Sequence, residues 1–314
     1  MQAVVYGEYG TPDVLEVEEI DVPAIKDDEV LVRVHASSIN SWDWDLLRGK
    51  PWYARIGGMR TPQYAVLGAD IAGRVEAVGK DVERFAVGDE VFGDLSASGW
   101  GGFAEYTAAR ERALAHKPAS MTFDQAAAIP QAAVLALQGL RDKKKIEPGQ
   151  KVLINGAGGG TGTFGVQIAK SYGAHVTGVD STAKLEMLTS MGVDHVIDYT
   201  KEDFTKNGER YDLILDVVAN RSNRAYKRSL NPDGVCVVVG GTTATLLRAF
   251  VLGGRKLTIL AHKPNAGDLD LLGQMFENGS IIPVIDRRFE LNDAAEALRY
   301  FGEGAVKGKV VITS

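Results

Sequence analysis

Cysteine is nearly absent from this 314-residue chain, in which Cys236 is the only one. A single thiol excludes an intramolecular disulfide framework and leaves no thiolate cluster for a structural zinc ion. Apolar runs of about 18 residues, the length that spans a bilayer, are also missing. The start, MQAVVYGEYG, has neither the basic nor the apolar stretch of a secretion signal. These absences predict a cytoplasmic protein without a membrane span.

An excess of positive charge is lacking as well. Lysine and arginine together number 35, aspartate and glutamate 41, and the formal net charge is -6. Proteins that bind nucleic acids usually need a basic face that displaces counterions from the phosphates. The charge therefore argues against nucleic-acid binding, although local basic groups can still hold one phosphate.

The pattern along the chain divides it into three stretches. Residues 1–122 contain short strands between turn signals, such as the alternating VLVRVHA, and predict a β-barrel catalytic domain. Residues 123–263 alternate between helix and strand, which predicts right-handed βαβ units and a doubly wound parallel sheet. Residues 264–314 end in a helix and the strand KVVITS, and we expect this segment to return to the first domain. The predicted fold class is α/β.

The strongest local signal is the glycine-rich stretch NGAGGGTGTFG, residues 155–165, which follows an apolar strand and opens a helix. In this context a turn without side chains lets a pyrophosphate approach the backbone amides, and the helix N-terminus attracts the anion. A glycine-rich turn used only for tight packing is the alternative. The stretch predicts a dinucleotide site.

The end of the following strand, VDSTAK, is where dinucleotide-binding folds place the residue that contacts the adenosine ribose. Asp180 at this point would accept hydrogen bonds from two ribose hydroxyls and would favour NAD. Ser181, Lys184 and Tyr199 would instead hold a 2′-phosphate and favour NADP. A third reading makes Asp180 a helix N-cap and Lys184 a solvated surface charge.

The whole chain resembles the medium-chain dehydrogenase/reductase superfamily, and within it the zeta-crystallin-like quinone oxidoreductases and the plant-type alkenal or ketol reductases. Matching segments occur from end to end in the family's order and spacing: SINSWDWDLLRG, LGADIAGRVEAVGKDVERFAVGDEVFG, GGFAEY, AAAIPQAAVLALQGL, GQKVLINGAGGGTGTFGVQIAK, HVIDY and GKVVI. The resemblance implies a GroES-like catalytic domain, built from both chain ends, and a Rossmann domain, with the cofactor between them.

The resemblance also implies roles for individual residues. Ala157, Gly159 and Gly162 fall on the three positions of the phosphate-binding turn, and Asn40 matches an asparagine at the mouth of the active site. The other implied cofactor contacts are Gly158, Gly160 and Thr161 at the pyrophosphate, Ser181, Lys184 and Tyr199 at a 2′-phosphate, Asn220, Val239, Gly240 and Gly241 at strand ends, and Ala261 and His262 near the nicotinamide.

Two positions depart from the family's pattern. Leu135 stands where members of this branch often have threonine. Asp180 is unusual for a protein that binds NADP, because a carboxylate repels a nearby phosphate. We nevertheless expect NADPH as the cofactor, with NADH as the alternative, since three positions favour the phosphate and one opposes it.

Zinc is not expected. Zinc-dependent alcohol dehydrogenases of the superfamily bind their catalytic metal through cysteines and a histidine or glutamate, but here the first of these stretches reads SINSW and the GHE motif reads Gly68, Ala69 and Asp70. Zinc prefers nitrogen and sulfur ligands, so Asp70 alone cannot form a site. Without a metal, the easier reaction is reduction of an acceptor that spreads the incoming charge over a conjugated carbonyl group.

We therefore predict NADPH-dependent reduction of quinones or α,β-unsaturated carbonyl compounds by hydride transfer. Asn40 is predicted to orient the nicotinamide or the carbonyl group, and Asp43 to support Asn40. No residue is assigned as the proton donor. The expected partner is a small conjugated carbonyl or quinone substrate, and a homodimer is the expected assembly. Met59 and the aromatic residues of the loops 51–64 and 97–106 are candidates for the pocket wall.

Two other functions remain open at this point. One is a zinc-free carbonyl or alcohol dehydrogenase that acts on saturated substrates, and preference for a simple ketone would favour it. The other is an NAD(P)H-binding protein with little turnover, which the missing proton donor and Leu135 allow. Tight NADPH binding without turnover would favour this second alternative.

Overall fold

The computed structural model describes residues 1–241 and 254–314, which belong to two compact units. Unit 1 consists of residues 1–131, 264–279 and 283–314, and unit 2 of residues 132–263 and 280–282. The sequence pattern places domain boundaries after residues 122 and 263, whereas the compact units change after residues 131 and 263. Each unit is described by itself below.

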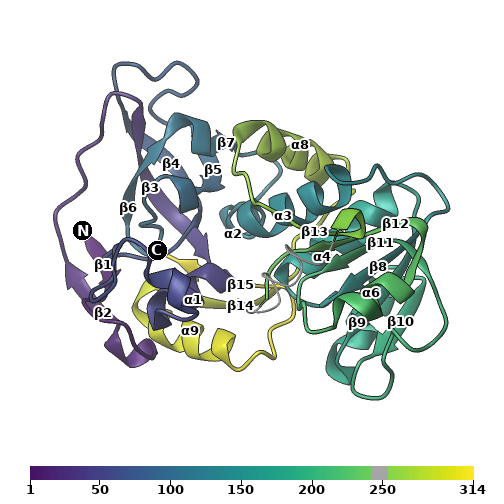
Figure 1. Cartoon of the computed structure of the whole chain (residues 1–314). Coiled ribbons are helices and arrows are strands. Elements are labelled where there is room, and N and C mark those ends of the chain that lie inside the picture. Colours follow the sequence, from purple (N-terminus) through teal and green to yellow (C-terminus); the bar gives the residue numbers. More distant parts are fainter. Residues whose placement is uncertain (242–253) are drawn as a thin grey trace. The chain divides into compact units, whose positions relative to one another are not determined.

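Unit 1 is built on a largely antiparallel sheet (Figure 1). The strand order is β14-β15-β3-β4-β5-β7, and β6 pairs with β3. The last strand, β15, pairs antiparallel with β3 and parallel with β14, so the end of the chain belongs to the same sheet as β3 and β4 near its beginning. The strands of unit 1 are β1 Gln2–Val5, β2 Glu16–Glu19, β3 Glu29–Ser38, β4 Asp70–Val78, β5 Glu90–Asp94, β6 Tyr106–Arg110, β7 Leu114–His116, β14 Ile285–Glu290 and β15 Lys309–Thr313.

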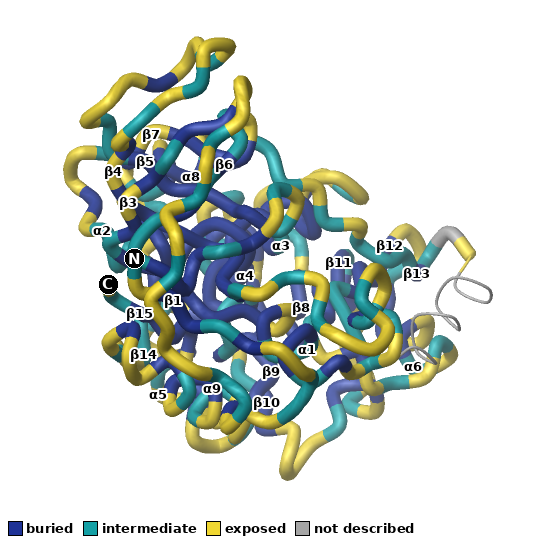
Figure 2. The backbone as a smooth tube through the Cα atoms, turned by 90° about the vertical axis from the view of Figure 1, so that its left-hand side faces the viewer, coloured by how far each residue is buried: buried dark blue, intermediate teal, exposed yellow. Residues whose placement is uncertain are grey.

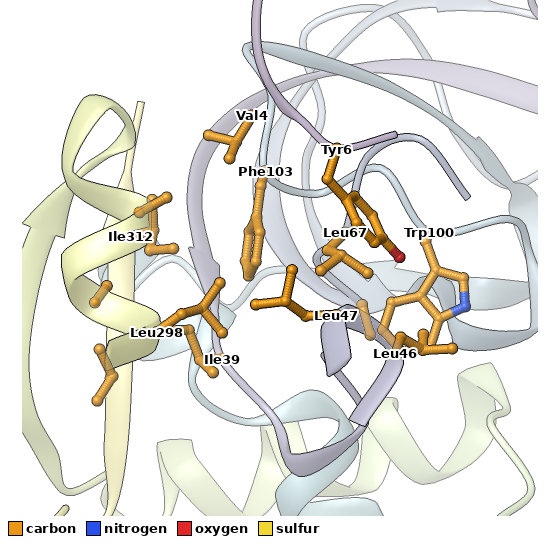
Figure 3. Close-up of a cluster of buried hydrophobic side chains, with 14 of the residues drawn as sticks. Val4, Tyr6, Ile39, Leu46, Leu47, Leu67, Trp100, Phe103, Leu298 and Ile312 are labelled. Atoms are coloured by element: carbon orange, nitrogen blue, oxygen red, sulfur yellow. The ribbon is translucent and has the colours of Figure 1, made fainter. Parts of the chain in front are cut away.

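One hydrophobic core of unit 1 joins the helices α1 (Ser41–Arg48) and α9 (Ala294–Gly302) to this sheet, as Figure 3 shows. Leu47 of α1 and Leu298 of α9 point toward Ile39 and Ile312 at the strand ends, and all four side chains are buried. Because Ile39 is fixed in this core, its neighbour Asn40 is held at the start of α1. The helices are α1 Ser41–Arg48, α2 Phe123–Ala127, α8 Ala266–Glu277 and α9 Ala294–Gly302, with 3-10 turns η1 Pro12–Val14, η2 Trp52–Arg55, η3 Leu95–Ala97, η4 Glu111–Ala113 and η7 Leu291–Asp293.

Unit 2 contains a parallel sheet of six strands in the order β10-β9-β8-β11-β12-β13. This is the order 3-2-1-4-5-6 of doubly wound dinucleotide-binding folds, in which ligands bind at the carboxyl ends of the strands, where the order reverses. Here the reversal lies between β8 and β11. The strands are β8 Lys151–Asn155, β9 His175–Asp180, β10 His195–Asp198, β11 Tyr211–Asp216, β12 Leu230–Val238 and β13 Leu257–Ile259.

The helices of unit 2 lie along this sheet (Figure 1). In Figure 2, β8, β9 and α4 run through dark blue, buried segments, since both faces of the sheet are covered. Pro130 begins α3, a position where its missing N–H costs nothing. The helices are α3 Pro130–Arg141, whose first two residues belong to unit 1, α4 Gly160–Ser171, α5 Leu185–Ser190 and α6 Asn223–Arg228, with 3-10 turns η5 Thr182–Lys184 and η6 Gly254–Lys256.

The predicted α/β class, with its parallel sheet, is confirmed. Within residues 1–241 and 254–314, no helix combines the length and the apolar character that crossing a membrane requires.

Candidate functional site

The glycine-rich segment forms the turn between β8 and α4. Gly156 has φ +84°, in the left-handed region that favours glycine, and α4 begins at Gly160 with Gly159 as its N-cap. A Cβ atom on Gly162 would lie 2.0 Å from the carbonyl oxygen of Gly156. Only glycine therefore lets the first turn of α4 pack against this loop. The free N–H groups of that turn lie beside backbone without side chains, an arrangement that suits a phosphate group.

The predicted cofactor residues lie along one edge of the parallel sheet in unit 2. The carboxyl ends of parallel strands share an edge, and each of these residues ends a strand or follows one. The glycine loop follows β8, Asp180 ends β9 and Tyr199 follows β10. The remaining ones are Asn220 after β11, Val239, Gly240 and Gly241 after β12, and Ala261 and His262 after β13. The fold thus gathers at one edge residues that are up to about a hundred positions apart in the sequence.

Asp180 is tied to the glycine loop rather than turned to solvent. Its Oδ2 accepts a hydrogen bond from the backbone N–H of Gly158 at 2.8 Å, and its Oδ1 accepts one from the N–H of Ser181, also at 2.8 Å. The residue is only 7% exposed. The carboxylate therefore holds the loop in place, and much of its capacity to accept further hydrogen bonds is already used.

Lys184 lies against the same carboxylate. Its Nζ is 3.9 Å from Asp180 Oδ1, and its stem covers Gly158, where an added Cβ would meet Lys184 Cδ at 2.7 Å. Lys184 is 8% exposed and so is not a solvated surface charge. Tyr199 is held nearby, because its N–H donates to the carbonyl oxygen of Asp180, while its side chain remains 53% exposed. The ammonium group of Lys184 thus offsets the negative charge of Asp180 beside the loop.

Asp216 is a residue of this edge that the sequence reasoning did not single out. It is fully buried at the end of β11, and its Oδ1 accepts hydrogen bonds from the Asn155 side chain at 2.9 Å and from the N–H of Ala219 at 2.7 Å. Asp216 therefore connects the loop that leads to Asn220 with the end of β8. The signal that could have found it is an acidic residue at the end of an otherwise apolar strand, LILD.

In unit 1, Asp43 is a buried anchor for Asn40. Asp43 is inaccessible to solvent, and its two carboxylate oxygens accept the backbone N–H groups of Asn40 at 2.7 Å and of Gly68 at 2.9 Å. Burial raises the pKa of Asp43 to about 7, against the two hydrogen bonds that lower it. Both hydrogen bonds of the Asp43 carboxylate come from backbone N–H groups, so its geometry fits support of Asn40 rather than contact with a substrate.

Asn40 itself belongs to a buried polar cluster, which we call the Asp70 cluster: Ser38, Asn40, Asp70, Gln131 and Lys309. The Lys309 ammonium donates to Asn40 Oδ1 at 2.5 Å and to Asp70 Oδ2 at 3.2 Å. Asp70 Oδ1 accepts the backbone N–H of Gln131 at 2.9 Å, and Ser38 Oγ lies 3.1 Å from Asp70 Oδ2. Sequence reasoning missed Lys309, which stands at the start of an apolar strand and could be read as a surface residue.

The residues expected in the pocket wall include an exposed group and a buried group. Trp52 and Met59 are 63% and 65% exposed on the loop after α1. Trp100 is buried in the core of unit 1 and Phe103 is completely inaccessible there (Figure 3), which leaves both outside a pocket wall. Because they are exposed, Trp52 and Met59 remain candidates for contact with an apolar molecule.

Two family models match the chain. The one described as "Alcohol dehydrogenase GroES-like domain" matches residues 26–119. The one described as "Zinc-binding dehydrogenase" matches residues 191–312. Along the chain the two matched domains follow each other in the order that the family resemblance implied.

Similar proteins share nearly the full length of the chain. The 2-methylene-furan-3-one reductase of Solanum lycopersicum is 35% identical, over 99% of this chain and 79% of its own. The NADPH-dependent alkenal/one oxidoreductase of Arabidopsis thaliana is 34% identical, over the same shares. Among solved structures, the quinone oxidoreductase from Coxiella burnetii has a TM-score of 0.92 and 28% identity, and the match covers 100% of this chain and 99% of that one.

The residues around Asp70 do not fit a zinc ion, although one family description names zinc. The Asp70 carboxylate already accepts hydrogen bonds from an ammonium group, a hydroxyl and a backbone N–H. The positive charge of the ammonium group would repel a metal ion at the same carboxylate. None of these neighbours is a thiolate or an imidazole, the ligands that zinc prefers. Across residues 1–241 and 254–314, no three His, Cys, Asp or Glu side chains are grouped so that they could hold a metal ion.

Proposed function

Because the chain belongs to the medium-chain dehydrogenase/reductase superfamily, in its quinone and enone oxidoreductase branch, we propose that it catalyses NADPH-dependent reduction of quinones or α,β-unsaturated carbonyl compounds by hydride transfer. The observation that carries the proposal is the gathering of the glycine loop, Asp180, Lys184 and Tyr199 at the carboxyl edge of a sheet with the order 3-2-1-4-5-6. This edge suits a dinucleotide.

The glycine loop would hold the pyrophosphate of the cofactor. The backbone between Ala157 and Gly162 and the N-terminus of α4 supply N–H groups and the positive end of the helix dipole. Asp180 keeps this loop in its conformation through Gly158. When bound, the reduced nicotinamide supplies the hydride, and the chain supplies binding and orientation.

Preference for NADPH rests on the charge balance beside Asp180. A free carboxylate here would repel a 2′-phosphate, but this one is hydrogen-bonded to the loop and lies close to the Lys184 ammonium. Lys184, Ser181 and the exposed Tyr199 hydroxyl are then available as donors to a phosphate. NADH remains the second coenzyme that the site would take, with lower affinity.

The acceptor would meet amide donors rather than a metal. A quinone or an enone that receives a hydride develops negative charge on its carbonyl oxygen, and preorganised hydrogen-bond donors stabilise that charge. In unit 1, the backbone of Asn40 is held at the start of α1 by Asp43. The NH2 group of the Asn40 side chain is the donor that we assign to the acceptor's oxygen.

The test is a comparison of acceptors under identical conditions. NADPH oxidation is followed with a 1,4-benzoquinone, a 2-alkenal and the corresponding saturated aldehyde. We expect turnover with one or both conjugated acceptors and little with the saturated one. Preference for the saturated aldehyde would favour a carbonyl or alcohol dehydrogenase instead. Tight NADPH binding without turnover on any of them would favour a binding protein.

A homodimer and a cytoplasmic location belong to the same proposal as expectations from the sequence. Sedimentation velocity of the purified chain tests the first of them. A mass near twice 33.7 kDa is the expected result, and a single monomeric species would contradict it.

A further inference from the structure

Lys309 is a buried cation to which the proposed function gives no task. It is the first residue of β15 and is 2% exposed. Its backbone N–H donates to the carbonyl oxygen of Val284 at 2.8 Å, so its main chain is fixed by the β14 side of the sheet. Removing an ammonium group from water is unfavourable unless close partners compensate for it. The contacts of Lys309 therefore indicate its role.

Asp70 provides the compensating charge. The carboxyl group is inaccessible to solvent, and burial raises its pKa, while the Lys309 ammonium acts in the opposite direction. Asp70 begins β4 and pairs with Ser38 of β3, which in turn pairs with Val311 of β15. Neighbouring strands thus place the carboxylate and the ammonium side by side, with their side chains 3.2 Å apart.

The second partner of Lys309 is the side-chain oxygen of Asn40, at 2.5 Å. An ammonium group can only donate hydrogen bonds, so it fixes which end of the Asn40 amide faces it. The oxygen faces Lys309, and the NH2 group is turned away from it. Lys309 thereby removes the ambiguity between the two orientations of a terminal amide.

The amide nitrogen that remains has no hydrogen bond of normal geometry. Asn40 is 6% exposed, and among the residues that the structure describes its Nδ2 meets only the Asp70 carboxyl, at a geometry short of a full hydrogen bond but close enough to lower the pKa of that carboxyl. Nε2 of Gln131, a residue that is 3% exposed and is attached to Asp70 through its backbone, has no hydrogen-bond partner among the same described residues. Buried donors are nearly always paired in folded proteins, so these two amide nitrogens of the Asp70 cluster point to an oxygen atom of a ligand.

We propose that Lys309 is a positioning residue: held by Asp70, its ammonium fixes the Asn40 amide so that the NH2 group donates to the carbonyl oxygen of the acceptor. This inference rests on the proposed function and deepens it. Lys309 itself does not touch the acceptor. The interaction it prepares becomes stronger as negative charge develops on that oxygen during hydride transfer, so the effect belongs to turnover rather than to coenzyme binding.

A double-mutant cycle tests the proposal with Lys309→Met, Asn40→Ala and the combined variant. Each single change is expected to lower kcat/KM for the conjugated acceptor by about 10- to 100-fold, because one preorganised donor is lost or misplaced. The dissociation constant for NADPH is expected to stay within about twofold of the wild-type value, since the coenzyme is held by unit 2. The combined variant is expected to be no worse than the poorer single one.

Two further variants separate positioning from stability. Lys309→Met leaves Asp70 buried without its partner, so Lys309→Met combined with Asp70→Asn is measured as well and is expected to show the same low kcat/KM with a more stable fold. The matched control is Lys117→Met. Lys117 is a buried lysine of unit 1 that donates to the Met121 carbonyl oxygen at 2.6 Å and pairs with Glu90 at 3.0 Å. It shares no partner with Lys309, and its loss is expected to leave kcat/KM unchanged.

Several results would overturn the inference. Unchanged kcat/KM in Lys309→Met, effects that multiply in the combined variant, or a loss confined to NADPH affinity would each contradict it while the wild-type enzyme turns over normally. Absence of wild-type turnover with every conjugated acceptor would contradict the proposed function and the inference together. The two failures are thus distinguishable by the wild-type reaction alone.

Discussion

The carboxylate of Asp180 accepts a hydrogen bond from the backbone N–H of Gly158 at 2.8 Å, so the acidic residue at the end of β9 holds the glycine loop. From the sequence alone, the same residue could be read as a contact to the ribose or as a group that repels a phosphate. The observed bond adds a further role, as a clamp on the loop. This role predicts how coenzyme affinity responds when the carboxylate is removed.

Asp180→Ala is expected to weaken NADPH and NADH binding alike, by about 10-fold, because an unpaired buried N–H costs about 1–3 kcal/mol and the loop loses its anchor. Fluorescence titration measures the dissociation constants of both coenzymes. Selective loss of NADH affinity would instead show that Asp180 contacts the ribose. Tighter binding of NADPH would show that it mainly opposes the phosphate.

Lys184→Met is expected to lower the affinity for NADPH by about 10- to 100-fold while leaving NADH nearly unchanged, since a charge-assisted hydrogen bond contributes about 1.5–3 kcal/mol. Methionine keeps most of the stem that covers Gly158. Lys201→Ala serves as the control, because the side chain of Lys201 is 70% exposed where it pairs with Asp198. Equal losses for both coenzymes in Lys184→Met would argue against a phosphate contact.

Gly162→Ala is expected to abolish measurable coenzyme binding and to lower the free energy of unfolding by about 1–3 kcal/mol. The added methyl group would lie 2.0 Å from the Gly156 carbonyl oxygen, so the loop or α4 must shift. Gly267→Ala in α8 is the control, because its Cβ would meet its nearest neighbour only at 3.5 Å. Thermal unfolding and NADPH titration report the two effects, and normal binding by Gly162→Ala would refute the tight packing of this turn.

Asp43 predicts a dependence of stability on pH. Its pKa is raised by burial to about 7 in the folded protein, against about 3.9 in an unfolded chain. The folded state therefore binds the extra proton between these values, and this group's contribution to stability falls as pH rises from about 4 to about 7. Across this range the contribution of Asp43 to the free energy of unfolding falls by an amount on the order of 4 kcal/mol, at about 1.4 kcal/mol for each pKa unit.

Asp43→Asn removes that titration. Urea unfolding at pH 5 and pH 8 is expected to show a smaller loss of stability across this range in the variant than in the wild-type protein. The variant is also expected to be less stable at pH 5, since its amide can accept only one of the two backbone N–H groups. Parallel pH dependences of the two proteins would rule out the shifted pKa.

Much of the fold could be predicted from local pattern. The alternation of helix and strand after residue 123 indicates a parallel sheet, and the glycine stretch marks where a strand turns into α4, because both signals lie within short segments. The burial of Phe103 and Trp100 could not be decided in the same way, since an aromatic residue between glycines fits a core and a pocket equally well.

The Asp70 cluster shows what local pattern misses. Lys309 is buried because β15 pairs with β3, more than 270 positions earlier in the chain, and because Asp70 begins the next strand. Nothing in the segment KGKVVITS distinguishes this lysine from one at a solvent-exposed strand end. Similarly, the residue type of Asp180 is compatible with several roles, and its hydrogen bond with the Gly158 backbone cannot be read from the sequence.

The central claim is that the coenzyme held at the glycine loop gives its hydride directly to a conjugated acceptor. The most direct measurement uses NADPH that carries deuterium at C4 of the nicotinamide, with mass spectrometry and NMR of the reduced 2-alkenal. We predict one deuterium atom on the β-carbon of the product, from one of the two C4 positions only. A reduced product without deuterium, or deuterated NADPH left unconsumed beside the acceptor, would contradict the account.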